Sequence, residues 1–444
     1  MWRRTVFLLP AVLVLGVVLL ALPWSRQAEA EVTTLKAPGP LVWRDFLGVN
    51  AQFHFFEPAI YQAQMQQLNE LGLEWVRIAM HWAYLEPQRG QFNLTAFDSM
   101  VEAMQQHQLK PVGFLVGSAP FATTAPADSP YQDSFPPKDN ALYGESLVRL
   151  AKHYDAFAAW QIWNEPNIFP FWRPKEDPQA YAKLLFQSAD ALRAHVPGKT
   201  VVAGGMAYYS NMPSHGGALM LQSLLQMGVA QKKLVMAYHP YTELPEGASP
   251  KQQDYLQHSN FINSALRAHG IEQIWATEWG WSSYSGPKEM QAIIGVDGQA
   301  DYTLRRLALM SAQDFDRIFL FNLSDLDSRA GPRDQGYGLL DLQARPKPVY
   351  NALANLLKVT GPRLEPSDAP RFEQAPNDLY NVTWTRQDGS HVWMFWSASG
   401  KQLRLPAVQR ATLHDPLTGE QRELQGGEGV VVPLKSSLQL LVWR

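Results

Sequence analysis

The chain of 444 residues is longer than one ordinary domain and is close in length to an α/β barrel of about 250 residues with insertions and one smaller module. Its formal net charge is only −3, with Lys and Arg spread through the chain, which argues against a nucleic-acid groove or an acidic-polymer track. There are no cysteines, so disulfides and thiolate chemistry are excluded and stability has to come from the core.

The amino terminus has the pattern of an export signal. Arg3 and Arg4 precede an apolar run over residues 6–24, and residues 28–30 read Ala-Glu-Ala, a signal-peptidase pattern. The run is longer than a usual signal core of about 7–15 residues and close to the ~20 that span a bilayer. Cleavage after Ala30 and retention of residues 6–24 as an inner-membrane anchor both stay open. Either outcome exports the rest of the chain, which we expect in the periplasm.

Between residues 41 and 356, short apolar or β-branched runs alternate with longer segments of helical periodicity. The eight runs cover residues 46–50, 75–79, 111–116, 158–163, 200–204, 234–238, 273–277 and 317–321. Helical spacing is clearest over residues 58–71, 96–108, 178–195 and 301–313. This eightfold alternation predicts an α/β fold of the (β/α)8 TIM-barrel type. A doubly wound sheet is the alternative, although it usually carries fewer repeats.

The pattern changes after Val359. Residues 360–362 read Thr-Gly-Pro, and strand-like runs follow at residues 380–386, 392–396, 411–413, 429–433 and 438–443, with Asp388-Gly389 as a hairpin signal. We predict a C-terminal β-sandwich that either binds glycans or caps the barrel. The predicted domains are therefore a signal peptide or membrane anchor over 1–30, a catalytic barrel over 31–358 and a β-sandwich over 359–444.

Two glutamates end apolar, strand-like runs and are surrounded by indoles and amides. Glu165 lies in Trp-Asn-Glu-Pro-Asn after the fourth predicted strand, and Glu278 lies in Thr-Glu-Trp-Gly-Trp after the seventh. Both should open onto the carboxyl rim of the barrel, where barrel chemistry occurs. Two carboxyl groups that flank a glycosidic bond can divide the work between a proton donor and a nucleophile or base. The alternatives are a solvated turn glutamate and a structurally paired one.

These residues resemble clan A, the large clan of retaining glycoside hydrolases with (β/α)8 barrels, and Trp-Asn-Glu-Pro-Asn is similar to family 39. The resemblance spans about residues 41–356. The order of leader, barrel and β-module is similar to that of exported bacterial endoglycosidases that act on the Psl-type biofilm exopolysaccharide. It implies that Glu165 is the acid/base, that Glu278 is the nucleophile and that Asn164 hydrogen-bonds the sugar 2-hydroxyl.

The resemblance implies roles for three further polar residues. Arg77, inside an apolar strand, would hold the nucleophile ionised; a buried structural ion pair is the alternative. His239 and Tyr241 match a His-x-Tyr motif whose hydroxyl approaches the nucleophile, and core packing is the alternative.

We expect sugar subsites to be built from side chains at predicted strand ends and rim loops, although each also suits a core. The candidates are His54, His81, Trp82, Phe169, Trp172, Tyr208, Trp281 and Tyr284. The clan often has a Trp at the end of strand eight, whereas this chain has Phe321. That departure leaves the floor of the −1 subsite undefined.

The two glutamates together with this resemblance imply a retaining endo-glycosidase that cleaves a neutral exopolysaccharide containing mannose, glucose or rhamnose by double displacement. Its two carboxyl carbons should lie about 5–5.5 Å apart, against roughly 6.5–9.5 Å in an inverting enzyme. The mechanism requires no metal or cofactor. Expected partners are the polysaccharide, the inner membrane through the N-terminal segment and exopolysaccharide biosynthesis proteins, but no nucleic acid. A transglycosylase and a non-catalytic polysaccharide-binding or assembly protein are the alternative functions.

Overall fold

A computed structural model describes residues 32–209, 220–287 and 293–444. The predicted signal peptide or anchor, residues 1–30, lies outside the described residues. In the three described ranges, no helix combines the length and the apolar character needed to cross a bilayer.

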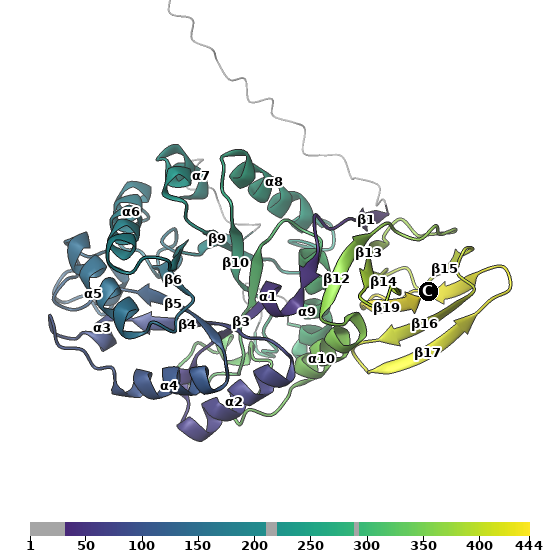
Figure 1. Ribbon diagram of the computed structural model, residues 1–444, viewed down its shortest axis with the longest axis horizontal. Coiled ribbons are helices and arrows are strands. Elements are labelled where there is room, and N and C mark those ends of the chain that lie inside the picture. Colours follow the sequence, from purple (N-terminus) through teal and green to yellow (C-terminus); the bar gives the residue numbers. More distant parts are fainter. Residues whose placement is uncertain (1–31, 210–219, 288–292) are drawn as a thin grey trace, which may run out of the picture.

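A parallel barrel ringed by helices makes up the larger part of the molecule (Figure 1). Its strands in chain order are β3 (Leu47–Ala51), β4 (Trp75–His81), β5 (Lys110–Val116), β6 (Ala159–Ile162), β7 (Thr200–Ala203), β8 (Met206–Tyr209), β9 (Met236–Tyr241), β10 (Ile274–Trp279) and β11 (Arg317–Leu320). Each of the eight predicted strands is present within a few residues, and the predicted TIM-barrel class is confirmed.

The barrel closes at its fifth strand, which is built in two pieces. β7 and β8 are separated by Gly204 and Gly205, and both reach β9. The amide of Val235 donates to the carbonyl of Val201 at 3.0 Å, and the amide of Ala203 donates to the carbonyl of Val235 at 2.9 Å. Because β7 bonds to Val235, just before β9, and β8 pairs in parallel with β9, the strands form a closed ring with no unpaired edge.

The helices pack outside the strands that they connect (Figure 1). α6 (Pro178–His195) coincides with its predicted range, because Pro178 occupies the first turn and the Asp177 side chain caps it by accepting from the Ala180 amide. α9 (Gly295–Ser311) begins six residues before the predicted 301–313. The other helices are α1 (Trp43–Phe46), α2 (Pro58–Glu70), α3 (Trp82–Leu85), α4 (Thr95–Gln106), α5 (Asn140–His153), α7 (Met220–Gln226), α8 (Tyr255–Ala268) and α10 (Pro348–Thr360).

The C-terminal part is the predicted β-sandwich. Its strands are β12 (Arg363–Ser367), β13 (Tyr380–Arg386), β14 (His391–Trp396), β15 (Gln402–Leu405), β16 (Arg410–Asp415), β17 (Glu420–Gln425), β18 (Val430–Pro433) and β19 (Gln439–Trp443). Antiparallel β15 and β18 form a second, small layer over the large sheet. A separate apolar cluster that includes Trp393, Phe395, Leu403 and Val432 fills the space between the layers.

Residues 33–42, which the sequence analysis places in the barrel domain, join the sheet of the sandwich instead. β1 (Thr33–Leu35) pairs in parallel with β13, and β2 (Leu41–Val42) pairs with β12. Figure 1 shows purple β1 beside green β13. Such pairing between distant segments leaves no local signal in the sequence, because β1 and β2 are only three and two residues long.

Candidate active site

A cleft of about 550 Å³ opens at the carboxyl ends of the barrel strands. Glu165 and Glu278 both line it, although 113 positions separate them in the chain. The parallel barrel brings them together because every strand ends at the same rim.

Glu278 lies within β10, one residue before its end, where the register of β10 against β11 shifts between the paired residues Ala276 and Trp279. Its Oε1 accepts from Arg77 Nη1 at 2.6 Å and its Oε2 accepts from the Tyr241 hydroxyl at 3.3 Å. The side chain is 13% exposed, which leaves the carboxylate accessible from the cleft. Strand pairing and two donors therefore fix its orientation.

Arg77 is fully buried beneath the cleft, and each of its three side-chain nitrogens has at least one hydrogen-bond partner. Nε donates to Gln161 Oε1 at 2.9 Å, and Nη2 donates to Asn164 Oδ1 at 2.8 Å. Nη1 also reaches Asn50 Oδ1 at 2.7 Å, which follows from the direct pairing of Asn50 with Arg77 in neighbouring strands. A buried guanidinium is tolerated when its charge is paired and its N–H groups are bonded. Arg77 thus links the nucleophile candidate to Asn164.

Glu165 is held differently, in irregular backbone beyond the end of β6. Its φ is 42° and that of Trp163 is 70°, a left-handed region that non-glycine residues rarely adopt. The Glu165 amide donates to the carbonyl of Gly205 at 3.0 Å, and the Trp163 indole donates to the carbonyl of Phe171. Strained backbone of this kind persists where surrounding contacts over-determine it, commonly at functional sites.

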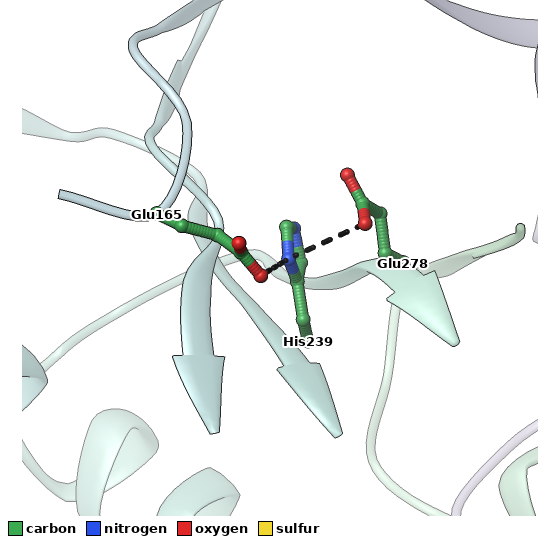
Figure 2. Close-up of side chains that lie close together, drawn as sticks. All are labelled: Glu165, His239 and Glu278. Atoms are coloured by element: carbon green, nitrogen blue, oxygen red, sulfur yellow. Dashed lines mark hydrogen bonds and ion pairs between the residues drawn. The ribbon is translucent and has the colours of Figure 1, made fainter. Parts of the chain in front are cut away.

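His239 lies between the two carboxylates, as Figure 2 shows. Its Nδ1 lies 2.8 Å from Glu165 Oε1 and 3.7 Å from Glu278 Oε2, while Nε2 lies 3.0 Å from Thr277 Oγ1. The close approach depends on Gly205, because a Cβ there would lie 2.0 Å from Nε2. One oxygen of each glutamate and the histidine nitrogen all lie within 4.8 Å of one another.

The two carboxyl groups are shifted in opposite directions. Burial raises the pKa of Glu165 above its ordinary value, and nearby Glu278 adds to this, against the opposing effects of His239 and Arg77. Burial also acts to raise the pKa of Glu278, but His239 and Arg77 outweigh it and hold that pKa below its ordinary value. At neutral pH this favours a protonated Glu165 beside an ionised Glu278.

Glu165, His239 and Glu278 are, among the described residues, the one set of acidic and histidine side chains with the spacing of a metal site. Arg77 contacts one oxygen of Glu278 and adds a positive charge there. That charge opposes a bound cation, so the donor set fits proton chemistry better than metal binding.

His54 and His81 line the cleft, as expected from the sequence. Burial, followed by the neighbouring His81 and Arg329, lowers the pKa of His54 to about 4, and burial lowers the pKa of His81 as well. The two rings lie 6.2 Å apart at their centroids. As neutral imidazoles they offer both a donor and an acceptor to a sugar hydroxyl.

Three tryptophans that the sequence analysis places in subsites do not line the cleft. Trp82, Trp172 and Trp281 are at most 2% exposed. The Trp82 indole donates to Glu86 at 2.8 Å, that of Trp281 donates to the carbonyl of Glu243 at 3.0 Å, and Trp172 packs edge-on against Trp163. The subsite prediction for these three is corrected, because their rings form the packing behind the cleft wall.

The remaining aromatic candidates also lie away from the carboxylates or outside what is described. Phe169 is 56% exposed and its ring is covered on one face by Arg173 rather than lining the cleft. Tyr284 is half-buried and does not line it. The backbone of Tyr208 lies in β8, and its side chain falls outside the described residues.

Several residues of the site were not singled out from the sequence. Phe114, Phe171 and Tyr337 line the cleft, and the Tyr337 ring lies 5.3 Å from that of Phe321, the residue noted at the end of the eighth predicted strand, with which it forms part of the wall. Asn50, Gln161, Thr277 and Gly205 position the charged groups from below. Polar residues inside otherwise apolar strands were the available signal for Asn50 and Gln161.

The chain matches the family model described as Cellulase (glycosyl hydrolase family 5) over residues 42–306, more than half of its length. No curated protein matches it. A family 39 glycoside hydrolase from the gut symbiont Bacteroides cellulosilyticus WH2 has a similar structure, with a TM-score of 0.67 and 19% identity over 90% of this chain and 80% of that one.

Two further solved structures share the architecture. A monomeric β-xylosidase from Caulobacter crescentus CB15 aligns with a TM-score of 0.64 and 17% identity over 93% of this chain and 99% of that one. A family 30 endoxylanase from Clostridium papyrosolvens C71 aligns with 0.59 and 12% over 93% and 99%. At these identities the likeness shows the fold. Together with the family match it establishes that the chain is a glycosidase of clan A and belongs to the cellulase family, glycosyl hydrolase family 5.

Proposed function

We propose that the protein is a retaining endo-glycosidase in which Glu165 is the acid/base and Glu278 is the nucleophile. One observation carries the proposal: two glutamates of opposite pKa shift face one cleft, with one oxygen of each within 4.8 Å of the other. This close approach supports direct attack by a carboxylate, as in retaining enzymes, over the wider arrangement of an inverting pair, which has to hold a water between its carboxyl groups.

In the first step, Glu278 attacks the anomeric carbon and forms an ester while the glycosidic bond breaks. Glu165 gives its proton to the departing oxygen. His239 is hydrogen-bonded to Oε1 of Glu165, so Oε2 is the oxygen left to face the leaving group. Arg77 and Tyr241 orient the oxygens of Glu278 for the attack.

In the second step, ionised Glu165 takes a proton from water, which attacks the anomeric carbon and releases Glu278 as a carboxylate. The pKa of Glu165 falls when ester formation removes the Glu278 charge, because that charge had raised it. One residue therefore serves as acid and then as base. Asn164, with its Oδ1 bonded to Arg77, presents its amide N–H groups to the sugar 2-hydroxyl.

For the substrate we propose a neutral exopolysaccharide of the Psl type, containing mannose, glucose or rhamnose. The Trp-Asn-Glu-Pro-Asn motif and the fold shared with a family 39 enzyme support a family 39-like specificity. The cleft offers aromatic rings and two neutral histidines, which suit uncharged sugars. We further propose that the enzyme acts in the periplasm, held at the inner membrane by residues 6–24, beside exopolysaccharide biosynthesis proteins.

The test is digestion of defined mannose-, glucose- and rhamnose-containing oligosaccharides, with mass spectrometry of the fragments and Glu165→Gln as the control. Internal cleavage by the wild type alone is expected. Release of single terminal sugars only would overturn the endo assignment. Products longer than the substrate at high acceptor concentration would assign transglycosylation instead of hydrolysis.

A further inference from the structure

One wall of the cleft is a segment without regular structure, residues 242–254, between β9 and α8. Thr242, Glu243, Ala248 and Gln252 line the cleft from this segment. Two tight bridges pair Leu244 with Gly247 and Ser249 with Gln252, and the Ala248 amide donates to Asp254 Oδ1 at 3.2 Å. Because the segment contains no helix or strand, its position over the cleft also depends on the parts of the molecule that hold it.

On the barrel side, Arg306 of α9 holds the start of this segment. The fully buried guanidinium donates to the carbonyl of Pro240 at 2.8 Å, to the carbonyl of Pro245 at 2.9 Å and to the hydroxyl of Thr242. These contacts fix residues 240–245. They do not reach residues 246–254, which carry Ala248 and Gln252.

The second half of the segment is bonded to the barrel at Glu246, whose carbonyl accepts from the Tyr255 amide at 2.9 Å, and it is also held by the β-sandwich. Trp396 of β14 donates its indole N–H to Glu246 Oε1 at 2.9 Å, and the Tyr380 hydroxyl of β13 donates to Gln253 Oε1 at 2.8 Å. The rings of Tyr380 and Trp396 stack at 5.2 Å with an interplanar angle of 4°. We call these four residues the interdomain latch.

The carboxylate of the latch, on Glu246, is buried, and an arginine of the barrel domain compensates its negative charge. Glu246 is 5% exposed, and Arg305 of α9 forms an ion pair with the oxygen that Trp396 also contacts. A buried carboxylate is costly unless its oxygens are bonded, so Glu246 favours the loop conformation that keeps both partners. That conformation requires the sandwich to be in place, because Trp396 belongs to it.

We propose that the C-terminal β-sandwich positions the substrate-binding wall of the cleft through the interdomain latch, with Trp396 and Tyr380 as positioning residues. The proposal rests on the proposed function, since it assigns the wall a role in holding a long sugar chain. The carboxylates themselves are held from β4, β9 and β10. Loosening the latch should therefore weaken binding and spare the chemical step.

The test compares Trp396→Phe with Trp393→Phe in the full-length protein. Both changes remove one indole N–H from the sandwich, but Trp393 donates to Asn381 within the sandwich and has no bond to the wall. Hydrogen–deuterium exchange is read by mass spectrometry on peptides covering residues 242–254. We expect roughly tenfold faster exchange in Trp396→Phe, the factor that follows from losing a hydrogen bond to a charged group. Wild-type exchange is expected in Trp393→Phe.

Kinetics on fragments of a mannose-, glucose- and rhamnose-containing exopolysaccharide give the second readout. Trp396→Phe should raise KM about fivefold with kcat within about twofold of wild type, the pattern of lost uniform binding. Tyr380→Phe, which removes only a hydroxyl, should show the same split at smaller size. It keeps the test decisive if the Trp396 variant does not fold.

Unchanged exchange over residues 242–254 in both latch variants would overturn the proposal, and so would a fall in kcat at constant KM. If the wild type cleaves none of these fragments, the proposed substrate fails. The exchange comparison remains independent of it, because it needs no substrate.

Discussion

The loop that carries Glu165 and the strand that carries Glu278 hold the same side chain in contrasting ways. Glu278 lies inside a strand, between the paired residues Ala276 and Trp279 of β10, and receives donors from Arg77 and Tyr241, which keep it ionised. Glu165 lies in left-handed backbone beyond a strand end, and burial favours its protonated form. The opposite pKa shifts of the two glutamates therefore come from burial and from the charges around each carboxyl group, and not from residue type.

Glu278→Gln tests the strand side of this comparison and has the largest expected effect. Removing the nucleophile should lower kcat by at least about 10⁴-fold, the scale seen when a covalent nucleophile is removed from an enzyme. Azide added to Glu278→Ala should restore turnover and give a glycosyl azide of inverted configuration, identified by NMR. Near-wild-type hydrolysis by Glu278→Gln would contradict the assignment.

Glu165→Gln tests the loop side. Loss of general acid–base catalysis should lower kcat about 10²–10⁴-fold. The loss should be smaller for dinitrophenyl glycosides, whose leaving group needs no proton. With Glu165→Ala, azide should give a product of retained configuration. Equal losses for good and poor leaving groups would show that Glu165 is not the proton donor.

His239 lies beside both glutamates, and His239→Gln tests its effect on the two carboxyl groups through the pH dependence of kcat/KM. In the wild type, we expect activity to fall at low pH as Glu278 gains a proton and at high pH as Glu165 loses one. His239 lowers the pKa of both carboxyl groups, so its removal should move both limbs of the profile to higher pH. His153→Gln, on the outer helix α5, is the matched control and should leave the profile in place.

Trp82→Phe has the smallest expected effect on activity. It distinguishes a residue that packs behind the cleft wall from one that lines the cleft. It removes the buried hydrogen bond to Glu86, which should cost about 1–3 kcal/mol of folding stability. Thermal denaturation should report this loss while KM stays unchanged. Phe171→Ala, in contrast, changes a residue that lines the cleft and should raise KM. A raised KM in Trp82→Phe would indicate that the Trp82 side chain contacts the sugar after all.

The strands of the barrel, helix α6 and the two glutamates could be predicted because their signals are local. Apolar periodicity, Asp177-Pro178 at a helix start and a carboxylate at a strand end all lie within a few residues of one another. The three tryptophans were assigned wrongly because the sequence around an indole at a strand end or in a rim loop is the same whether the ring faces the cleft or the core. Tyr337 was missed because it lies in a long loop without periodicity, and β1 because its partner β13 lies at the other end of the chain.

Retention of configuration is the most direct test of the central claim, that Glu278 attacks the anomeric carbon while Glu165 supplies the proton. Proton NMR during hydrolysis of a susceptible oligosaccharide identifies the first-formed anomer before mutarotation mixes the two. A double displacement predicts that this anomer has the configuration of the bond that was cleaved. First appearance of the inverted anomer would contradict the account.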